Sequence, residues 1–256
     1  MSDTPAFRFS RIFGKPEKEA PKSLFPQTRW TLVTRSKSGD TREASAALEE
    51  LCALYWKPLY LFLRRTGRSE HDAQDATQEF FAHILTKDLF HGADADRGRL
   101  RTFLLTSLRN FTADRGRTER AEKRGGGAAP LSIDFLEAER GFEAASAISP
   151  EKEFEFRWAT TLLQNAMDRV RESYEASGKA DLFEGLKPLL SWNARSRPQH
   201  EVAAELGLSD SAMRVALHRL RSRFGDAVRE LVSDTVSKPE EIDDEIQHLF
   251  RALSKG

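Results

Sequence analysis

Apolar residues recur at helical spacing along most of the chain, and this pattern predicts a protein built from helices. The first such run extends from about Ser45 to Gly67, with apolar positions at Leu48, Leu51, Cys52, Tyr55, Leu59, Phe62 and Leu63. Pro58 lies inside the run, where a proline is expected to kink or divide a helix. Strict alternation of apolar and polar residues never lasts long enough for a strand. The expected fold class is therefore all-α.

Two more helices are expected in the first half of the chain. Ser69 with Asp72 three residues later resembles a capping box, and the stripe behind this start comprises Ala73, Ala76, Phe80 and Ile84. The third helix begins near Leu100 and runs into a basic segment. The sequence GGGAAP at 125–130 ends this first helical domain.

The second half contains the pattern of a helix-turn-helix, in the sequence EVAAELGLSDSAMRVALHRLRSRF. Gly207 stands where the turn needs a residue without a side chain, and Ser209 is placed to cap the second helix. On a helical wheel, one face of this second helix is apolar over about 60°. Its members are Met213, Leu217, Leu220 and Phe224.

An adjoining face of the same helix is polar and basic, with Asp210, Ser211, Arg214, His218 and Arg221. Residues early in such a helix are the ones that reach base edges in the major groove, whereas Arg219 and Arg223 point elsewhere and suit phosphate contacts. A solvated helix without a ligand explains the arginines, but not the turn and cap before them. The pattern therefore favours DNA binding.

Charge is balanced over the 256 residues, with 40 Lys and Arg against 40 Asp and Glu, so any basic surface must be local. The segment 96–124 is such a surface, because it holds nine basic residues and four acids. Arg109 and Arg117 share a face there if the helix is continuous, with Phe103 and Phe111 interleaved. Basic residues beside aromatic ones suit single-stranded or opened DNA, although Phe111 also fits a place in the core.

Other function classes find little support in the sequence. Cys52 is the single cysteine and lies in an apolar run, so we expect a buried thiol in a cytoplasmic protein. No apolar stretch approaches the ~20 residues of a membrane span, so we expect no membrane insertion. The six histidines lack zinc-site spacing, and there is no phosphate-binding glycine loop or nucleophile motif. We expect no enzyme activity, no cofactor and no metal site.

We expect two helical domains joined by a linker. The predicted division is a flexible leader at 1–23, a first domain at 24–127, a linker at 128–152 that lies against a surface, and a helix-turn-helix domain at 153–234. An acidic amphipathic extension follows at 235–256, with an apolar stripe at Ile242, Ile246, Leu249, Phe250 and Leu253. This extension either packs on the body of the protein or inhibits it, with its acids competing for the arginine face of the helix-turn-helix.

Two long stretches resemble bacterial RNA polymerase sigma factors of the extracytoplasmic-function group. The residues YWKPLYLFLRR, SEHDAQDATQEFFAHIL and DADRGRLRTFLLTSLRNFTADRGR resemble sigma region 2, and the helix-turn-helix resembles region 4. The resemblance covers about 45–125 and 155–232. It implies a transcription initiation factor without catalytic chemistry, whose partners are core RNA polymerase and promoter DNA.

The resemblance also assigns roles to residues by position. An acidic helix would dock on core polymerase through Asp72, Asp75, Gln78 and Glu79. The minus-10 promoter element would meet Asp96, Arg97, Arg99, Arg101, Arg109, Asn110, Asp114, Arg115 and Arg117. The minus-35 element would meet Ser209, Asp210, Ser211, Arg214, His218, Arg219, Arg221 and Arg223.

The chain departs from the family pattern at several positions. Gln74 and Thr77 make the docking helix less acidic than usual, and we hypothesise that a phosphate on Thr77 restores charge and switches polymerase binding. Val215 and Ala216 stand where polar or basic residues are common. Control by an anti-sigma factor, by a kinase or by the extension all remain open. The alternative function is a helix-turn-helix regulator that does not engage polymerase.

Overall fold

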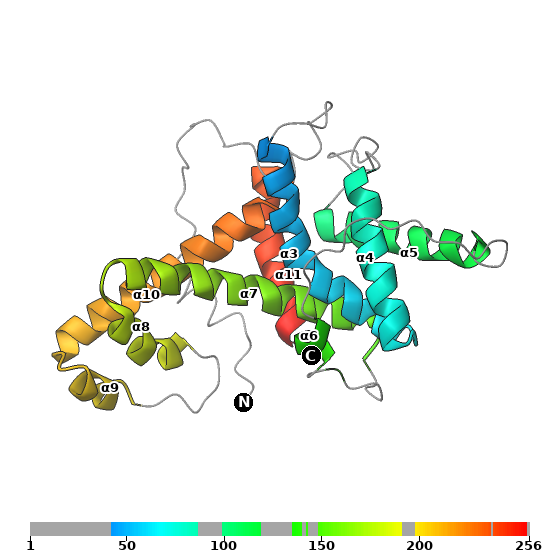
Figure 1. Cartoon of the computed structure of the whole chain (residues 1–256). Helices are drawn as coiled ribbons and strands as arrows, with labels where there is room; N and C mark the ends of the chain where they lie inside the picture. Colours follow the sequence, from blue (N-terminus) through cyan, green and yellow to red (C-terminus); the bar gives the residue numbers. More distant parts are fainter. Residues whose placement is uncertain are drawn as a thin grey trace. The chain divides into compact units, whose positions relative to one another are not determined.

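The computed structural model describes residues 42–86, 99–118, 135–139, 142, 148–190, 198–236 and 238–254. All regular elements within these ranges are helical, so the predicted all-α fold is confirmed for the described part of the chain (Figure 1). In chain order they are α3 (Arg42–Arg65), α4 (Glu70–Thr86), α5 (Leu100–Thr118), α6 (Phe135–Glu139), α7 (Pro150–Ala176), α8 (Ala180–Leu186), η3 (Lys187–Leu190), α9 (Gln199–Glu205), α10 (Asp210–Ser233), η4 (Pro239–Glu241) and α11 (Ile242–Ser254).

The chain forms two compact units. The first, which we call the α3–α5 unit, contains α3 to α6, α7 as far as Thr161, and the chain from Val232 onward with η4 and α11. The second, the helix-turn-helix unit, contains α7 from Leu162, then α8, α9 and α10 as far as Leu231. The C-terminal extension thus groups with the α3–α5 unit, and the predicted boundary at 152/153 falls within α7.

The core of the α3–α5 unit is built on α3, which packs along α4. Tyr55, Leu59 and Phe62 of α3 are buried, as are Phe80 and Ile84 of α4. Pro58, which was expected to kink or divide the first helix, does not divide it, because α3 is one helix from Arg42 to Arg65 with Pro58 inside it. A proline removes only one backbone hydrogen bond, and burial of the apolar side chains on either side stabilises the continuous helix.

The start of α4 follows the predicted capping pattern. The backbone N–H of Asp72 donates to Oγ of Ser69 over 3.1 Å, and the Ser69 hydroxyl donates to Oδ2 of Asp72 over 2.6 Å. These bonds occupy one of the amide groups that a helix start leaves without an intrahelical acceptor. They fix where the acidic helix begins.

The segment predicted as a linker contains α6, which lies against α3. The ring of Phe135 contacts those of Trp56 and Tyr60, at centroid distances of 5.6 and 4.9 Å. Glu139 accepts hydrogen bonds from the Tyr60 hydroxyl, at 2.5 Å, and from Nε of Arg64, at 2.7 Å. The prediction that this linker lies on a surface is confirmed for 135–139.

The first turn of α7 is held to α3 through a buried carboxylate. Glu153 is 3% exposed, and it accepts hydrogen bonds from Arg65 at 2.8 Å and from Arg157 at 2.7 Å. Burial by itself would raise the pKa of Glu153, but the hydrogen bonds and positive charges of the two arginines outweigh it, and the pKa is lowered.

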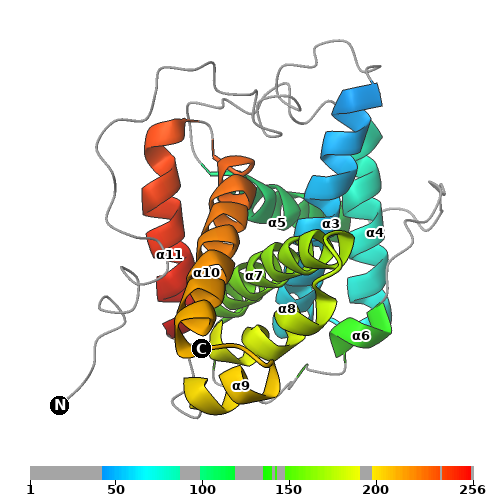
Figure 2. The same ribbon diagram turned by 90° about the vertical axis from the view of Figure 1, so that its left-hand side faces the viewer.

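The helix-turn-helix unit depends on a close approach between α8 and the end of α9 (Figure 2). A β-carbon placed on Gly185 would lie 2.8 Å from Cδ2 of Leu206, so a larger residue at 185 would force the Leu206 side chain to shift. Phe183 of α8 is fully buried and contacts the ring of Tyr174 at 5.7 Å. Helix α8 thus contacts both the end of α9, at Leu206, and α7, at Tyr174.

We predict that Glu153 gives the protein an acid-sensitive stability. Its pKa is lower in the folded than in the unfolded chain, so its contribution is present above the unfolded pKa and is lost as pH falls through the folded value. Glu153→Gln should lose stability at neutral pH and lose less further stability between about pH 5 and pH 2. Urea midpoints across this range measure the effect, with Glu172→Gln, an exposed position on α7, as control. Identical pH profiles for Glu153→Gln and the parent chain would contradict the prediction.

Candidate functional site

The turn between α9 and α10 has the geometry that the sequence predicts. Gly207 has a φ of +63°, a conformation that residues with a side chain rarely adopt. The N–H groups of Gly207 and Leu208 donate to the carbonyls of Ala204 and Ala203, at 3.2 and 2.9 Å. The end of α9 is therefore closed tightly, and the chain reverses into α10 within a few residues.

Ser209 caps α10 as predicted. Its Oγ accepts a hydrogen bond from the N–H of Ala212 at 3.2 Å, and its carbonyl accepts one from Met213 at 2.8 Å. Asp210 adds a negative charge at the first turn, where the helix dipole favours it. Turn and cap together fix the direction in which the outer face of α10 points within its unit.

The two faces of α10 separate as the wheel predicts. Met213, Leu217, Leu220 and Phe224 are buried. The residues assigned to the minus-35 element lie on the surface: Ser209, Asp210, Ser211, Arg214, His218, Arg219 and Arg223 are exposed, and Arg221 is half-buried. The guanidinium of Arg223 lies 5.0 Å from the ring centre of Tyr174. The helix thus carries a polar, cationic outer surface above an apolar inner one.

The predicted minus-10 residues on α5 lie in mixed surroundings. Arg109 and Asn110 are exposed, as is Asp114, and Arg109 forms an ion pair with Glu151 while lying 5.2 Å from the ring centre of Phe62. Asp96 and Arg97, and the side chain of Arg117, lie outside the described residues.

Phe111 packs on α4, where its ring contacts those of Phe80 and His83 at 5.7 and 5.1 Å. Of the two alternatives for Phe111, packing against the protein is therefore the one observed, and the ring is not available for stacking on bases.

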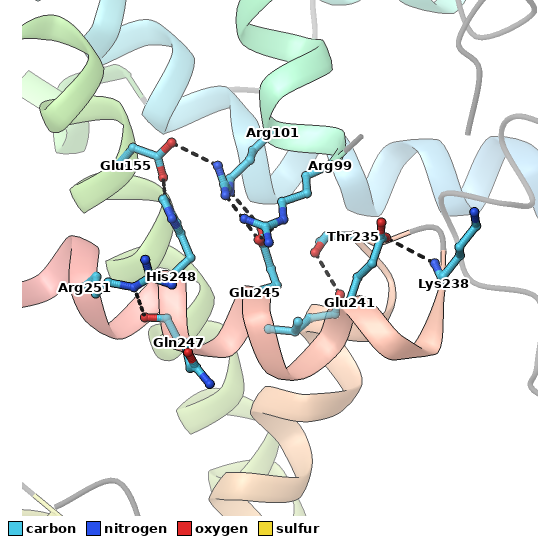
Figure 3. A network of polar contacts seen from close by, with 11 residues as sticks. Arg99, Arg101, Glu155, Thr235, Lys238, Glu241, Glu245, Gln247, His248 and Arg251 are labelled. Carbon is cyan, nitrogen blue, oxygen red and sulfur yellow. Dashed lines mark hydrogen bonds and ion pairs between the residues drawn. The ribbon is translucent and has the colours of Figure 1, made fainter. Parts of the chain in front are cut away.

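Arg99 and Arg101 meet a carboxylate of the C-terminal helix (Figure 3). Nε and Nη2 of Arg101 donate to the two oxygens of Glu245, at 2.7 and 3.2 Å, and Nε of Arg99 lies 2.9 Å from Oε2. Arg101 is 5% exposed and Glu245 is fully buried. The Arg101 guanidinium is therefore enclosed and paired, and the predicted contact of Arg101 with DNA would require this pairing to be broken.

A second carboxylate completes this network. Glu155 of α7 accepts a hydrogen bond from Nη1 of Arg101 at 3.1 Å and shares one with Nε2 of His248 at 2.5 Å (Figure 3). Burial alone would raise the pKa of Glu155, but the bond with His248 and the charge of Arg101 lower it. The ring of Trp158 lies 5.2 Å from the Arg101 guanidinium. We call Arg99, Arg101, Glu155, Glu245 and His248 the α11 network.

Sequence reasoning missed the α11 network, although one signal for it was present. Glu245 stands between Ile242, Ile246 and Leu249 on the apolar stripe of α11, and all three apolar residues are buried. An acid on such a stripe requires a cation inside the protein. The expectation that the extension packs on the body of the protein is confirmed, and its buried acid pairs with arginines of the α3–α5 unit.

The predicted docking face of α4 is exposed only in part. Asp72 and Glu79 are exposed, whereas Asp75 and Gln78 are half-buried. Glu79 forms an ion pair with Arg115 of α5, and Asp75 lies 3.2 Å from Nδ1 of His71. Each of these acids thus has a partner within the chain.

The hypothesis of a phosphate on Thr77 is contradicted by burial. Thr77 has no exposed surface, and its hydroxyl donates to the carbonyl of Ala73 at 2.7 Å. A kinase needs access to that oxygen, and a phosphate there would place charge in the buried interior of the protein.

Among the described residues, no group of three or more potential metal ligands occurs, and Cys52 is a buried thiol. No described helix is long and apolar enough to cross a membrane. Comparison of the chain with protein-family models, with curated proteins and with solved structures finds no match.

We predict that Glu245→Gln destabilises the α3–α5 unit by about 3 to 5 kcal/mol, because removal of one partner leaves a buried charge uncompensated. Urea denaturation followed by tryptophan fluorescence measures the loss. Asp244→Asn, one residue earlier and exposed, is the matched control and should change stability by no more than about 0.5 kcal/mol. Equal stabilities for the two variants would show that the α11 network is energetically neutral.

Proposed function

We propose that this chain is a transcription initiation factor of the bacterial sigma type, which binds core RNA polymerase and directs it to specific promoters. The helix-turn-helix would contact the minus-35 element, and the α3–α5 unit would contact the minus-10 element. The proposal involves no catalytic step or cofactor, and it places the protein in the cytoplasm, where polymerase works.

The observation that carries the proposal is the outer face of α10. Arg214, His218 and Arg219 are exposed on the helix whose first turn is fixed by Gly207 and Ser209. A helix presented in this way fits the major groove, with its early residues at base edges. Its arginines also attract phosphates, whatever the DNA sequence.

The acidic surface of α4 supports the polymerase part of the proposal. Asp72, Asp75 and Glu79 repel phosphate, so their natural partner is a basic protein surface and not DNA. The contacts of Asp75 with His71 and of Glu79 with Arg115 are on the surface, where even a full ion pair is worth about 0 to 1 kcal/mol. A polymerase surface carrying arginine or lysine can therefore replace His71 or Arg115 at small cost.

The α11 network narrows the proposed minus-10 surface. Arg101 leaves the set of DNA contacts because it is buried, and Arg99 is already paired with Glu245. Arg109, Asn110, Asp114 and Arg115 remain, together with Asp96, Arg97 and Arg117. Exchange of Glu151 or Glu79 for a phosphate would free Arg109 and Arg115 for DNA.

A second candidate is a regulator that binds duplex DNA without engaging polymerase. It is favoured by the pairing of Glu79 with Arg115, which neutralises part of the expected docking face. The same α10 surface would serve either function, so the α4 face is where the two candidates differ.

Binding and transcription assays with bacterial core RNA polymerase test the proposal. The full chain should be retained by core enzyme and should support promoter-specific run-off transcription. Asp72→Lys should weaken retention, whereas Asp168→Lys, on α7, is a control that should not. Binding to duplex DNA without any retention by core enzyme would establish the regulator instead.

We predict that two arginines of α10 differ in their roles. Arg214→Ala should cost about 1 to 3 kcal/mol on the selected DNA sequence and relax specificity at one position. Arg223→Ala should weaken binding to all sequences and lower the slope of log K against log salt by about one. Titrations of each variant at several salt concentrations, on selected and random duplexes, measure both effects. Equal losses on random DNA for the two variants would contradict this division.

A further inference from the structure

Val215 is the exposed large apolar side chain among those that the structure describes, at 48% exposure. It stands on α10, two residues after the buried Met213 and two before the buried Leu217. Single apolar residues on a surface are common and by themselves carry no conclusion. Val215, however, lies beside the residues of α10 that are proposed to contact DNA.

Val215 lies on the side of α10 farthest from the core. At 100° per residue it is about 170° from the centre of the stripe formed by Met213, Leu217, Leu220 and Phe224. The residues one turn away on the same side are Ser211, Ala212, His218 and Arg219; Ala212 is half-buried and the other three are exposed. The valine thus lies beside polar and cationic groups that are proposed to meet DNA.

Neither packing nor helix formation accounts for a valine at this place. Its side chain adds nothing to the buried stripe, and a β-branched residue is a weaker helix former than alanine. In a major groove, however, one base offers an apolar group, since thymine carries a 5-methyl on that edge. The side chain of Val215 could contact this methyl group on the floor of the groove, while the cationic side chains beside it contact phosphates of the DNA backbone.

We propose that Val215 reads a thymine through its 5-methyl group and is a specificity-determining residue of α10. This inference rests on the proposed DNA-binding function. Ser211 and Arg219, four residues before and after, would contact the neighbouring bases or phosphates. The preference given by Val215 is for the methyl itself, so deoxyuridine, which pairs identically, should be bound less well at that position.

The test begins by selecting bound sequences from a random duplex library, using the full chain alone and mixed with bacterial core RNA polymerase. Each enriched thymine is then replaced by deoxyuridine, one at a time, and binding is measured. For the parent chain, one replacement should weaken binding roughly fourfold, the effect expected for one buried methyl-sized group.

The variant Val215→Ala supplies the decisive comparison. Alanine is compatible with an exposed helix position, so the variant keeps its fold, which circular dichroism verifies. It should bind the thymine and deoxyuridine duplexes equally well at the position where the parent distinguishes them. Ser222→Ala, an exposed substitution later on the same helix, is the control and should keep the parent's discrimination.

The outcomes separate the inference from the function on which it rests. Enrichment of a sequence together with equal methyl sensitivity in the parent and Val215→Ala would overturn the role of Val215 and leave DNA binding intact. Absence of sensitivity at every thymine in the parent would do the same. No enriched sequence, with or without polymerase, would overturn both.

Discussion

The carboxylate of Glu245 is the group on which the α3–α5 unit depends, because it joins residues 144 positions apart in the chain. A buried ion pair loses hydration on both sides, and good geometry is needed to offset this. Here Arg101 donates to both oxygens of Glu245, and Arg99 forms a third contact with the same carboxylate. The remaining nitrogen of the Arg101 guanidinium, Nη1, pairs with Glu155. The beginning of α5, the first turns of α7 and the last helix are thereby fixed to one another, and the N–H of Leu100 adds a hydrogen bond to the carbonyl of Thr235.

Features that depend on neighbours in sequence were predictable, and features that depend on distant partners were not. Helical periodicity, the cap at Ser69, the turn at Gly207 and the two faces of α10 are all determined within a few residues, and the structure confirms them. Arg101 lies in a basic segment that is typical of DNA contacts, yet its partner in the structure is Glu245, far away in the sequence. Pro58 does not divide α3 for a similar reason, because burial of the side chains around it overrides the local tendency to break the helix.

The net charge of the chain is zero, but the two units differ in how closely acids lie to their arginines. In the α3–α5 unit, acids face the arginines directly: Glu79 meets Arg115, Glu151 meets Arg109, and Glu245 meets Arg101. On α10, by contrast, Arg214 and Arg219 stand on the exposed outer face above an apolar one. Charge that cancels over the whole molecule therefore still leaves a cationic helix. The proposed binding of DNA by the basic residues of α5 would require phosphates to replace the protein acids that now pair with them.

The place of α11 also bears on how the protein is made. A ribosome releases α3, α4 and α5 long before Glu245 and the apolar residues beside it, and the residues of the helix-turn-helix unit come in between. During that interval Arg101 has no carboxylate from α11, so the α3–α5 unit cannot reach its final packing, whereas α9 and α10 have all their local partners earlier. The final packing of the α3–α5 unit therefore requires the synthesis of α11, which follows that of α9 and α10.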